Sequence, residues 1–190
     1  FAKKMGEQFS GELKDLKIDG DRATATLAGP TANQPIEFRN SPDRDRKLRI
    51  GFISGDLRQH SVAFFLEPLL WNLDRANLDV YLYSMVQKPD ARTERFRSLA
   101  THWRALPHAR DLALAEAVRT DQIDILIELG GLTSPYILAG LAHRAAPVQC
   151  TYLGYPNTTG LRSIDYRLID SITDPPGTEP FATETLLRLD

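Results

Sequence analysis

The sequence predicts an α/β protein in which a doubly wound, Rossmann-like parallel sheet follows a small N-terminal β segment. Two observations predict this fold. From residue 47 onward, short apolar segments alternate with longer helical segments, which is typical of parallel strands joined by right-handed helical crossovers. Before residue 41, apolar and polar residues alternate around an Asp-Gly pair, which indicates antiparallel strands joined by a tight turn.

The same patterns divide the chain into three parts. Residues 1–40 are expected to form a small β-rich accessory segment, and residues 41–46 a polar linker with no apolar face. Residues 47–190 are expected to form the Rossmann-like lobe. In the accessory segment, the expected strands lie at residues 13–18, 23–27 and 35–38, with a turn at Asp19-Gly20-Asp21.

Apolar, β-branched and aromatic residues mark the expected strands of the lobe. These strands cover residues 48–54, 78–83, 103–106, 123–129, 147–153 and 165–170. The expected helices between them cover residues 62–73, 93–101, 111–120 and 136–143. Asp111 is expected to cap the third helix, and Pro68 to kink the first helix or to shift its start.

Four loops are the candidate ligand-binding segments. In an open parallel sheet, ligands bind beyond the carboxyl ends of the strands. This rule selects the loops at residues 54–60, 130–133, 154–160 and 171–177. Each carries glycine or small polar residues, which let backbone N–H groups approach a ligand closely. We therefore expect the four loops to form one ligand edge.

Individual polar residues allow more than one interpretation. His60 is either an imidazole placed for hydrogen bonding or proton transfer, or a helix-start residue bonded to nearby backbone. Glu128 lies near the expected ligand edge and is a further site candidate, whereas Asp124 is expected to form a structural ion pair or an exposed strand start. Cys150 is expected to be an inert core thiol. The other histidines are expected to be solvated or capping residues: His102, His108 and His143.

Composition excludes several classes of function. The net charge of −2 gives no argument for a nucleic-acid or anionic-membrane partner. No apolar run approaches the ~20 residues that a membrane span needs, and no apolar leader is visible, so a cytoplasmic location is expected. A lone cysteine and four scattered histidines predict no metal site. The segment from Gly51 to Asp56 lacks the third glycine of a dinucleotide fingerprint.

Several ordered segments of the lobe resemble landmarks of the O-GlcNAc transferase family, which includes SPINDLY proteins and bacterial homologues. The first is Lys47-Leu48-Arg49-Ile50-Gly51-Phe52-Ile53-Ser54-Gly55-Asp56 followed by His60, and the second is residues 123–133. The third and most specific is Ala145-Ala146-Pro147-Val148-Gln149-Cys150-Thr151-Tyr152-Leu153-Gly154-Tyr155-Pro156-Asn157-Thr158-Thr159-Gly160. Residues 164–170 and 174–177 continue the match in order, so that it covers residues 47–190.

The resemblance implies the N-terminal lobe of a GT-B glycosyltransferase, with an active site between two Rossmann-like lobes. It implies inverting transfer of N-acetylglucosamine from UDP-GlcNAc to Ser or Thr of a protein or peptide acceptor, with UDP-GlcNAc as donor substrate and no separate cofactor. His60 falls on the family's active-site histidine. The loop against the donor sugar corresponds to Leu153, Gly154, Tyr155 and Pro156. No segment here offers a basic clamp for a diphosphate, so the UDP-binding lobe is expected beyond Asp190, and this chain alone is expected to be inactive.

Three departures from the family pattern leave alternatives open. Ser61 stands where the family often has proline, and Leu132 where it often has histidine or tyrosine. The first 40 residues predict strands, whereas the family usually has helical repeats there. The alternatives are a non-catalytic Rossmann-like module that binds a protein or small ligand, and a chain whose working part is the accessory segment. Self-association through an exposed lobe face is also a possible outcome.

Overall fold

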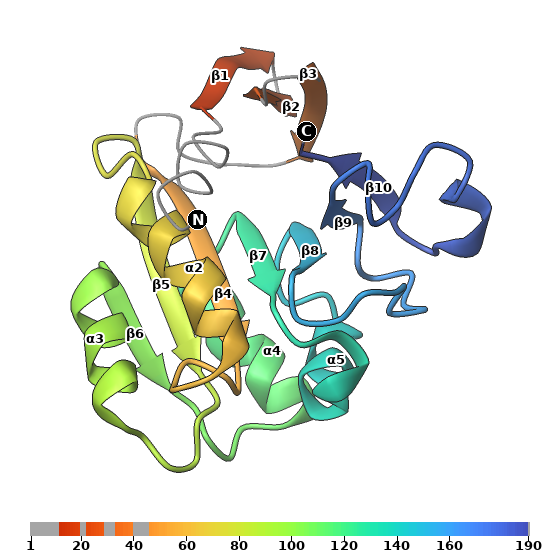
Figure 1. Ribbon diagram of the computed structural model, residues 1–190. Coiled ribbons are helices and arrows are strands. Elements are labelled where there is room, and N and C mark those ends of the chain that lie inside the picture. The colour runs from red at the N-terminus through yellow and green to blue at the C-terminus, as the bar shows by residue number, and fades with distance from the viewer. Residues whose placement is uncertain (1–11, 20–21, 29–32, 40–45, 190) are drawn as a thin grey trace.

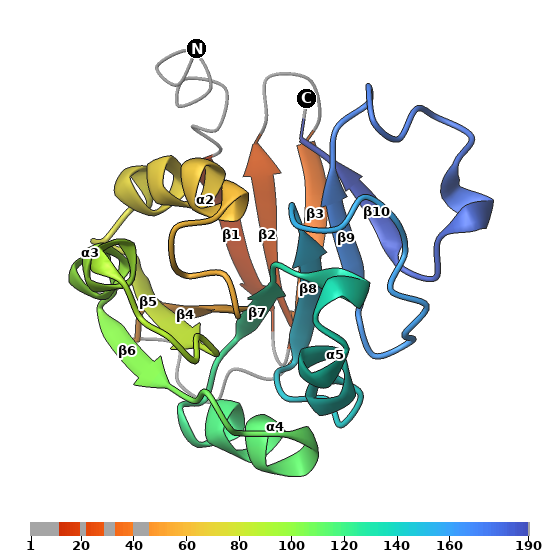
Figure 2. The ribbon, with the colours of Figure 1, turned by 60° about the horizontal axis from the view of Figure 1, so that its bottom comes forward.

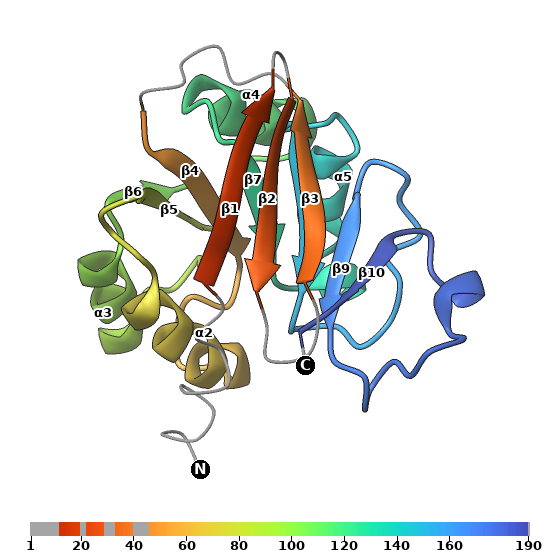
Figure 3. The ribbon, with the colours of Figure 1, turned by 90° about the horizontal axis from the view of Figure 1, so that it is seen from above.

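The computed structural model describes residues 12–19, 22–28, 33–39 and 46–189. The first three ranges form an antiparallel sheet of β1 (Glu12–Asp19), β2 (Arg22–Ala28) and β3 (Asn33–Arg39), whose strands run side by side in Figure 3. The three strands expected in the accessory segment are therefore confirmed. Gly20 and Asp21 of the expected turn lie outside the described residues, as do residues 41–45 of the expected linker. The division into accessory segment, linker and lobe stays a prediction.

The rest of the chain is built on a seven-stranded parallel sheet, which confirms the predicted fold class (Figure 1). Its strands in chain order are β4 (Leu48–Ser54), β5 (Leu78–Ser84), β6 (His102–Ala105), β7 (Ile125–Glu128), β8 (Val148–Tyr152), β9 (Tyr166–Ile169) and β10 (Thr185–Arg188). The spatial order is β10-β9-β8-β7-β4-β5-β6. The chain thus winds outward from β4 to β6, returns to β7 beside β4, and winds outward on the other side.

Helices cover both faces of this sheet. One face carries α2 (Ser61–Asn72) and α3 (Ala91–Leu99), and the other carries α4 (Asp111–Thr120) and α5 (Pro135–Leu141), seen as two separate groups in Figure 2. Neighbouring side chains of β4 explain this double cover, because successive residues of a strand point to opposite faces. Phe52 packs in the core with α2 and α3, whereas Ile53 packs in the core with α4 and α5.

Some local expectations were wrong. The N-cap of α4 is Arg110, which makes no side-chain cap bond, and Asp111 is the first helical residue, with a positive φ of 45°. Helix α2 begins at Ser61 and continues through Pro68 to Asn72, so Pro68 does not shift its start, whereas the kink stays a prediction. The sequence patterns gave no sign of β10 or of the two short 3-10 helices at Gly131–Thr133 and Glu179–Phe181.

Two structural expectations for polar and thiol side chains are confirmed. The Asp124 carboxylate forms a bidentate ion pair with Arg46, at 2.7 and 2.6 Å, and also accepts the Arg49 N–H at 2.8 Å. Cys150 is buried mid-strand, and burial raises the pKa of its thiol, which keeps it protonated and unreactive.

Candidate functional site

The four candidate loops do leave the sheet at one edge. Strands β4, β7, β8 and β9 are consecutive parallel neighbours, and Ile53 lies opposite Glu128, which lies opposite Thr151. The chain reverses its winding direction between β4 and β7. That switch point is where open α/β sheets hold their ligands, and here the loop ending at His60 and the loop at Gly130 flank it.

His60 is the N-cap of α2. Its backbone is extended, and its Nδ1 accepts the backbone N–H of Val62 at 3.4 Å. The same nitrogen lies 3.8 Å from Oδ2 of Asp56, and the side chain is 38% exposed. The expected backbone contact of a helix-start residue is therefore present. Because Nδ1 accepts a hydrogen bond, the neutral ring carries its proton on Nε2, and Nε2 bonds to none of the described residues.

A second carboxylate ties the His60 loop to its neighbour. Asp90 caps α3 by accepting the N–H of Thr93 at 2.9 Å, and its other oxygen accepts the N–H of Gln59 at 2.8 Å. These backbone bonds, from Gln59 first and then Thr93, hold the pKa of Asp90 below its usual value. The residue before His60 is thus fastened to the start of the next helix.

The loop after β8 is packed against the turn after β7. Leu153 adopts a positive φ of 74°, a conformation that costs a non-glycine residue about 1 kcal/mol or more. An ideal Cβ on Gly154 would stand 1.8 Å from the carbonyl oxygen of Leu129, and one on Gly131 would stand 2.4 Å from the Cβ of Tyr155. Only glycine permits these two close approaches. Each of the two turns therefore has a glycine at the position where the other turn packs against it.

Glu128 organises the turn after β7. Its fully buried carboxylate accepts the N–H groups of Gly130 and Gly131, each at 2.8 Å, and the Thr151 hydroxyl. Burial raises the pKa of this carboxyl, against the opposing effect of those hydrogen bonds. The glycine N–H groups that could hold a phosphate are therefore occupied by the protein's own carboxyl group.

Two charged residues hold the loop after β8 from its other side. Arg167 of β9 donates to both oxygens of Asp174, at 2.9 and 2.7 Å, and to the carbonyl of Pro156 at 2.6 Å. Glu184 accepts the N–H of Thr159 at 2.7 Å and the hydroxyls of Thr158 and Thr159. Sequence reasoning missed both residues. For Arg167 the available signal was a lone charge within an apolar strand, which needs a buried partner.

The match to known proteins agrees with this geometry. The model of glycosyl transferase family 41 matches residues 30–187. The chain belongs to glycosyl transferase family 41. The predicted family resemblance is thereby confirmed, and the match begins inside the segment expected to be accessory.

Curated relatives of this chain are much longer than the chain itself. It is 46% identical over 154 residues to a probable UDP-N-acetylglucosamine–peptide N-acetylglucosaminyltransferase SPINDLY of Petunia hybrida, covering 79% of this chain and 16% of that protein. It is 31% identical over 144 residues to the UDP-N-acetylglucosamine–peptide N-acetylglucosaminyltransferase of Caenorhabditis elegans, covering 72% of this chain and 12% of that protein. The chain therefore spans less than a fifth of the length of these curated relatives.

A solved structure of an O-GlcNAc transferase has the same fold. A mutant of the Thermobaculum terrenum O-GlcNAc transferase superposes with a TM-score of 0.74 and 44% sequence identity, covering 80% of this chain and 29% of that chain. The Rossmann-like lobe expected from the sequence is thus also the architecture of a catalytic-domain relative.

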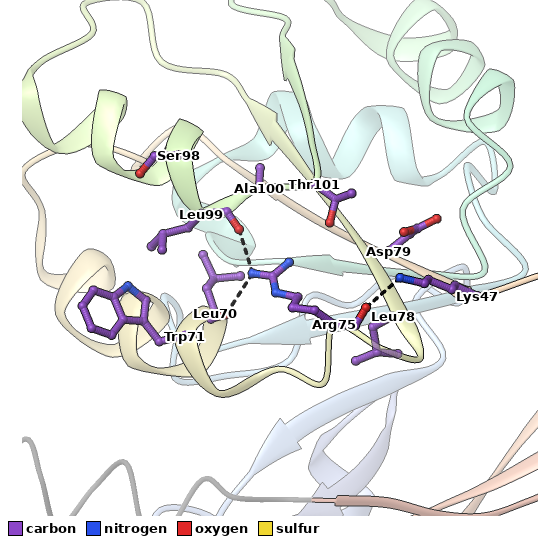
Figure 4. A pocket seen from close by; sticks show the side chains of 10 residues that line it. All are labelled: Lys47, Leu70, Trp71, Arg75, Leu78, Asp79, Ser98, Leu99, Ala100 and Thr101. Carbon is purple, nitrogen blue, oxygen red and sulfur yellow. Dashed lines mark hydrogen bonds between the residues drawn. The ribbon is translucent and has the colours of Figure 1, made fainter.

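An open cavity among the described residues lies at the opposite edge of the sheet (Figure 4). It has a volume of about 530 Å³ and lies between the starts of β4 and β5 and the ends of α2 and α3. Its cations are bonded to backbone: Arg75 donates to the carbonyls of Leu70 at 2.9 Å and Leu99 at 2.7 Å, and Lys47 donates to the Arg75 carbonyl at 2.7 Å. This arrangement closes helix ends rather than presenting charge to a ligand.

Two structural features are absent from the part of the chain that the structure describes: clusters of metal-ligating side chains and long apolar helices. No cluster of three or more His, Cys, Asp or Glu side chains there is arranged to hold a metal ion. Within the same residues, no helix is long and apolar enough to cross a membrane.

Proposed function

We propose that this chain is the N-terminal lobe of a GT-B glycosyltransferase that transfers N-acetylglucosamine from UDP-GlcNAc to Ser or Thr of a protein or peptide acceptor. Family membership supports the proposal, since relatives are named UDP-N-acetylglucosamine–peptide N-acetylglucosaminyltransferases. The observation that carries it is the shared edge: the loop ending at His60 and the loop beginning at Leu153 both leave the sheet beside the Glu128 turn.

The proposed transfer is an inverting displacement at the anomeric carbon. The acceptor hydroxyl oxygen forms a bond to the anomeric carbon while the bond between that carbon and the diphosphate oxygen breaks. UDP leaves with the electron pair of the broken bond, and the hydroxyl proton passes to a base. His60 presents Nε2 at the edge as a hydrogen-bond donor that can orient an oxygen of the substrates. Leu153, Gly154, Tyr155 and Pro156 form the surface against the donor sugar.

The departing diphosphate requires stabilisation that the glycine N–H groups and the Arg167 guanidinium at this edge do not offer. The N–H groups of Gly130 and Gly131 are engaged by Glu128, and Arg167 is engaged by Asp174 and Pro156. A stabilising group for developing negative charge must point at it from a fixed position. We therefore assign the diphosphate to a second, C-terminal lobe, and expect the 190-residue chain alone to be inactive.

Further expectations accompany this proposal. A cytoplasmic location and self-association of the isolated lobe stay predictions, and a bacterial source is proposed from the resemblance to bacterial homologues. UDP-GlcNAc is proposed as donor substrate without a separate cofactor.

A chimera tests the proposed function. Residues 47–189 of this chain replace the matching segment of the Thermobaculum terrenum O-GlcNAc transferase, and UDP-GlcNAc-dependent labelling of an acceptor peptide is measured. We expect the chimera to label the peptide and the isolated chain not to. His60→Ala should lower the rate of the chimera by about a hundredfold or more. The matched control is His143→Ala, because His143 is an exposed histidine that precedes β8, at the opposite edge of the sheet.

Two results would count against the proposal. The first is a folded chimera that shows no transfer. The second is an active chimera in which His60→Ala leaves the rate unchanged. Either result would show that this edge takes no part in the reaction as proposed. A folded, inactive chimera together with peptide binding by the isolated chain would favour the non-catalytic binding module instead.

A further inference from the structure

We propose that Arg167 is a positioning residue that fixes the loop at residues 153–156 in the shape that the transfer needs. The catalytic consequence rests on the proposed function, whereas the effect on the loop can be measured without it. Arg167 touches no substrate-facing atom in this account. It acts through the Pro156 carbonyl, which lies at the end of the loop predicted to contact the donor sugar.

The contacts of Arg167 join two edge loops. One guanidinium nitrogen donates only to Asp174, in the loop after β9, while the other donates both to Asp174 and to the Pro156 carbonyl, in the loop after β8. The Arg167 side chain is 6% exposed and that of Asp174 is 14% exposed. A buried ion pair of this kind is strongly damaged when one member is removed, so each charge depends on the other.

The loop after β8 has further fixed points, and Arg167 lies between them. At its start, Gly154 packs directly on the Leu129 carbonyl, and at its end, Thr159 is bonded to Glu184. Asp174 is itself anchored, because Arg188 donates to its backbone carbonyl at 2.7 Å. The Arg167 bond to the Pro156 carbonyl therefore ties the middle of this loop to strand β9.

Arginine is required at this position by geometry. Its planar fork can satisfy a carboxylate and a carbonyl on different loops at once, whereas a lysine ammonium is a single point charge on a flexible stem. Arg167→Lys therefore keeps a positive charge for Asp174 but is expected to lose the Pro156 carbonyl. This variant therefore tests the contact with the loop while it keeps the positive charge that balances Asp174.

The chain contains a control of the same chemistry in a more exposed setting, with the Arg144 side chain 47% exposed and the Asp165 side chain 25% exposed. Arg144 donates to both oxygens of Asp165, at 2.6 and 2.8 Å, and to the Ser163 carbonyl at 2.8 Å. This pair has the same combination of fork, carboxylate and carbonyl, but it precedes β8 and β9, at the edge opposite the candidate loops. Arg144→Lys should therefore leave residues 153–160 unchanged.

Hydrogen–deuterium exchange of the 190-residue chain is the first test. We expect Arg167→Lys to raise the exchange rate of residues 153–160 by about tenfold, with β4 and β7 unchanged. Arg144→Lys should not raise it. Unchanged exchange in 153–160, or an equal rise in β4, would overturn the proposal, because the first shows no hold on the loop and the second a general loss of stability.

Kinetics in the chimera are the second test. We expect Arg167→Lys to raise KM for UDP-GlcNAc by about tenfold and leave KM for the acceptor peptide unchanged, since the loop is predicted to face the sugar. An active chimera in which Arg167→Lys changes neither kcat nor KM for UDP-GlcNAc would overturn the positioning role. A chimera without transfer would overturn the proposed function, and the exchange comparison alone would then decide whether Arg167 holds the loop.

Discussion

The carbonyl oxygen of Leu129 occupies the space that a side chain at residue 154 would need. An ideal Cβ on Gly154 would stand 1.8 Å from that oxygen, well inside any permitted contact. Leu129 directly follows β7 and Gly154 follows β8, so the contact joins two neighbouring edge loops backbone to backbone. The clash cannot be relieved by rotating a side chain.

This contact predicts a selective cost for Gly154→Ala. Because the backbone itself must move, we expect the free energy of unfolding to fall by about 2 to 3 kcal/mol in chemical denaturation. The matched control is Gly160→Ala in the same loop. Gly160 also has a positive φ, of 74°, but nothing lies within 4 Å of its added Cβ, so backbone strain alone should cost about 1 kcal/mol. Equal costs for the two variants would contradict the close packing of the two loops.

Glu128 predicts a specific pH dependence of stability. Burial raises the pKa of this carboxyl above its ordinary value of 4.5, so the folded state holds the proton more tightly than the unfolded state. Stability from this group is therefore full below pH 4.5 and is lost as the pH rises through the raised pKa. We expect Glu128→Gln to gain stability relative to wild type as the pH rises above 4.5. A stability difference that is constant from pH 4 to about pH 8 would contradict this account.

For Glu184, the predicted dependence of stability on pH has the opposite sign to that for Glu128. Burial alone would raise its pKa, but hydrogen bonds from Thr158 and Thr159 outweigh burial and lower it. The stability that Glu184 contributes is thus present above the unfolded value of 4.5 and is lost as the pH falls through the lowered pKa. Glu184→Gln should lower the free energy of unfolding by about 1 kcal/mol at neutral pH and by much less in acid. An equal loss at both pH values would show that the charge is irrelevant.

Two substitutions separate the structural role of His60 as a helix cap from its proposed chemical role. Asparagine is a good N-cap residue, so His60→Asn should keep the bond to the Val62 N–H and the stability of α2, whereas His60→Ala should lose about 1 kcal/mol. If the imidazole takes part in the reaction, both variants of the chimera should lose peptide labelling equally. Labelling by His60→Asn at the wild-type rate would mean that residue 60 acts only as a helix cap.

The order of strands and helices could be predicted because each depends on local pattern. Strand β4 matches its expected bounds, since the apolar residues Leu48, Ile50, Phe52 and Ile53 lie close together between charged and polar residues. The shared edge followed from the parallel arrangement alone. The position of His60 at a helix start could also be read from the apolar run that begins at Val62.

The hydrogen bonds that hold the site loops could not be predicted, because the two partners of each bond are distant in sequence. Glu184 bonds to Thr159 and Glu128 bonds to Thr151, and neither pair has a spacing that a helix or turn would suggest. Strand β10 escaped prediction because four residues in an irregular region carry too little periodicity. Asp111 was a plausible cap by residue type, but the chain enters α4 one residue earlier.

The most direct test of the central claim is a crystal structure of the chimera with UDP-GlcNAc and an acceptor peptide. The account predicts the sugar against residues 153–156, with His60 Nε2 within hydrogen-bond distance of a substrate oxygen and the diphosphate on the other lobe. A sugar bound instead in the cavity beside Lys47 and Arg75, at the opposite edge of the sheet, would contradict it.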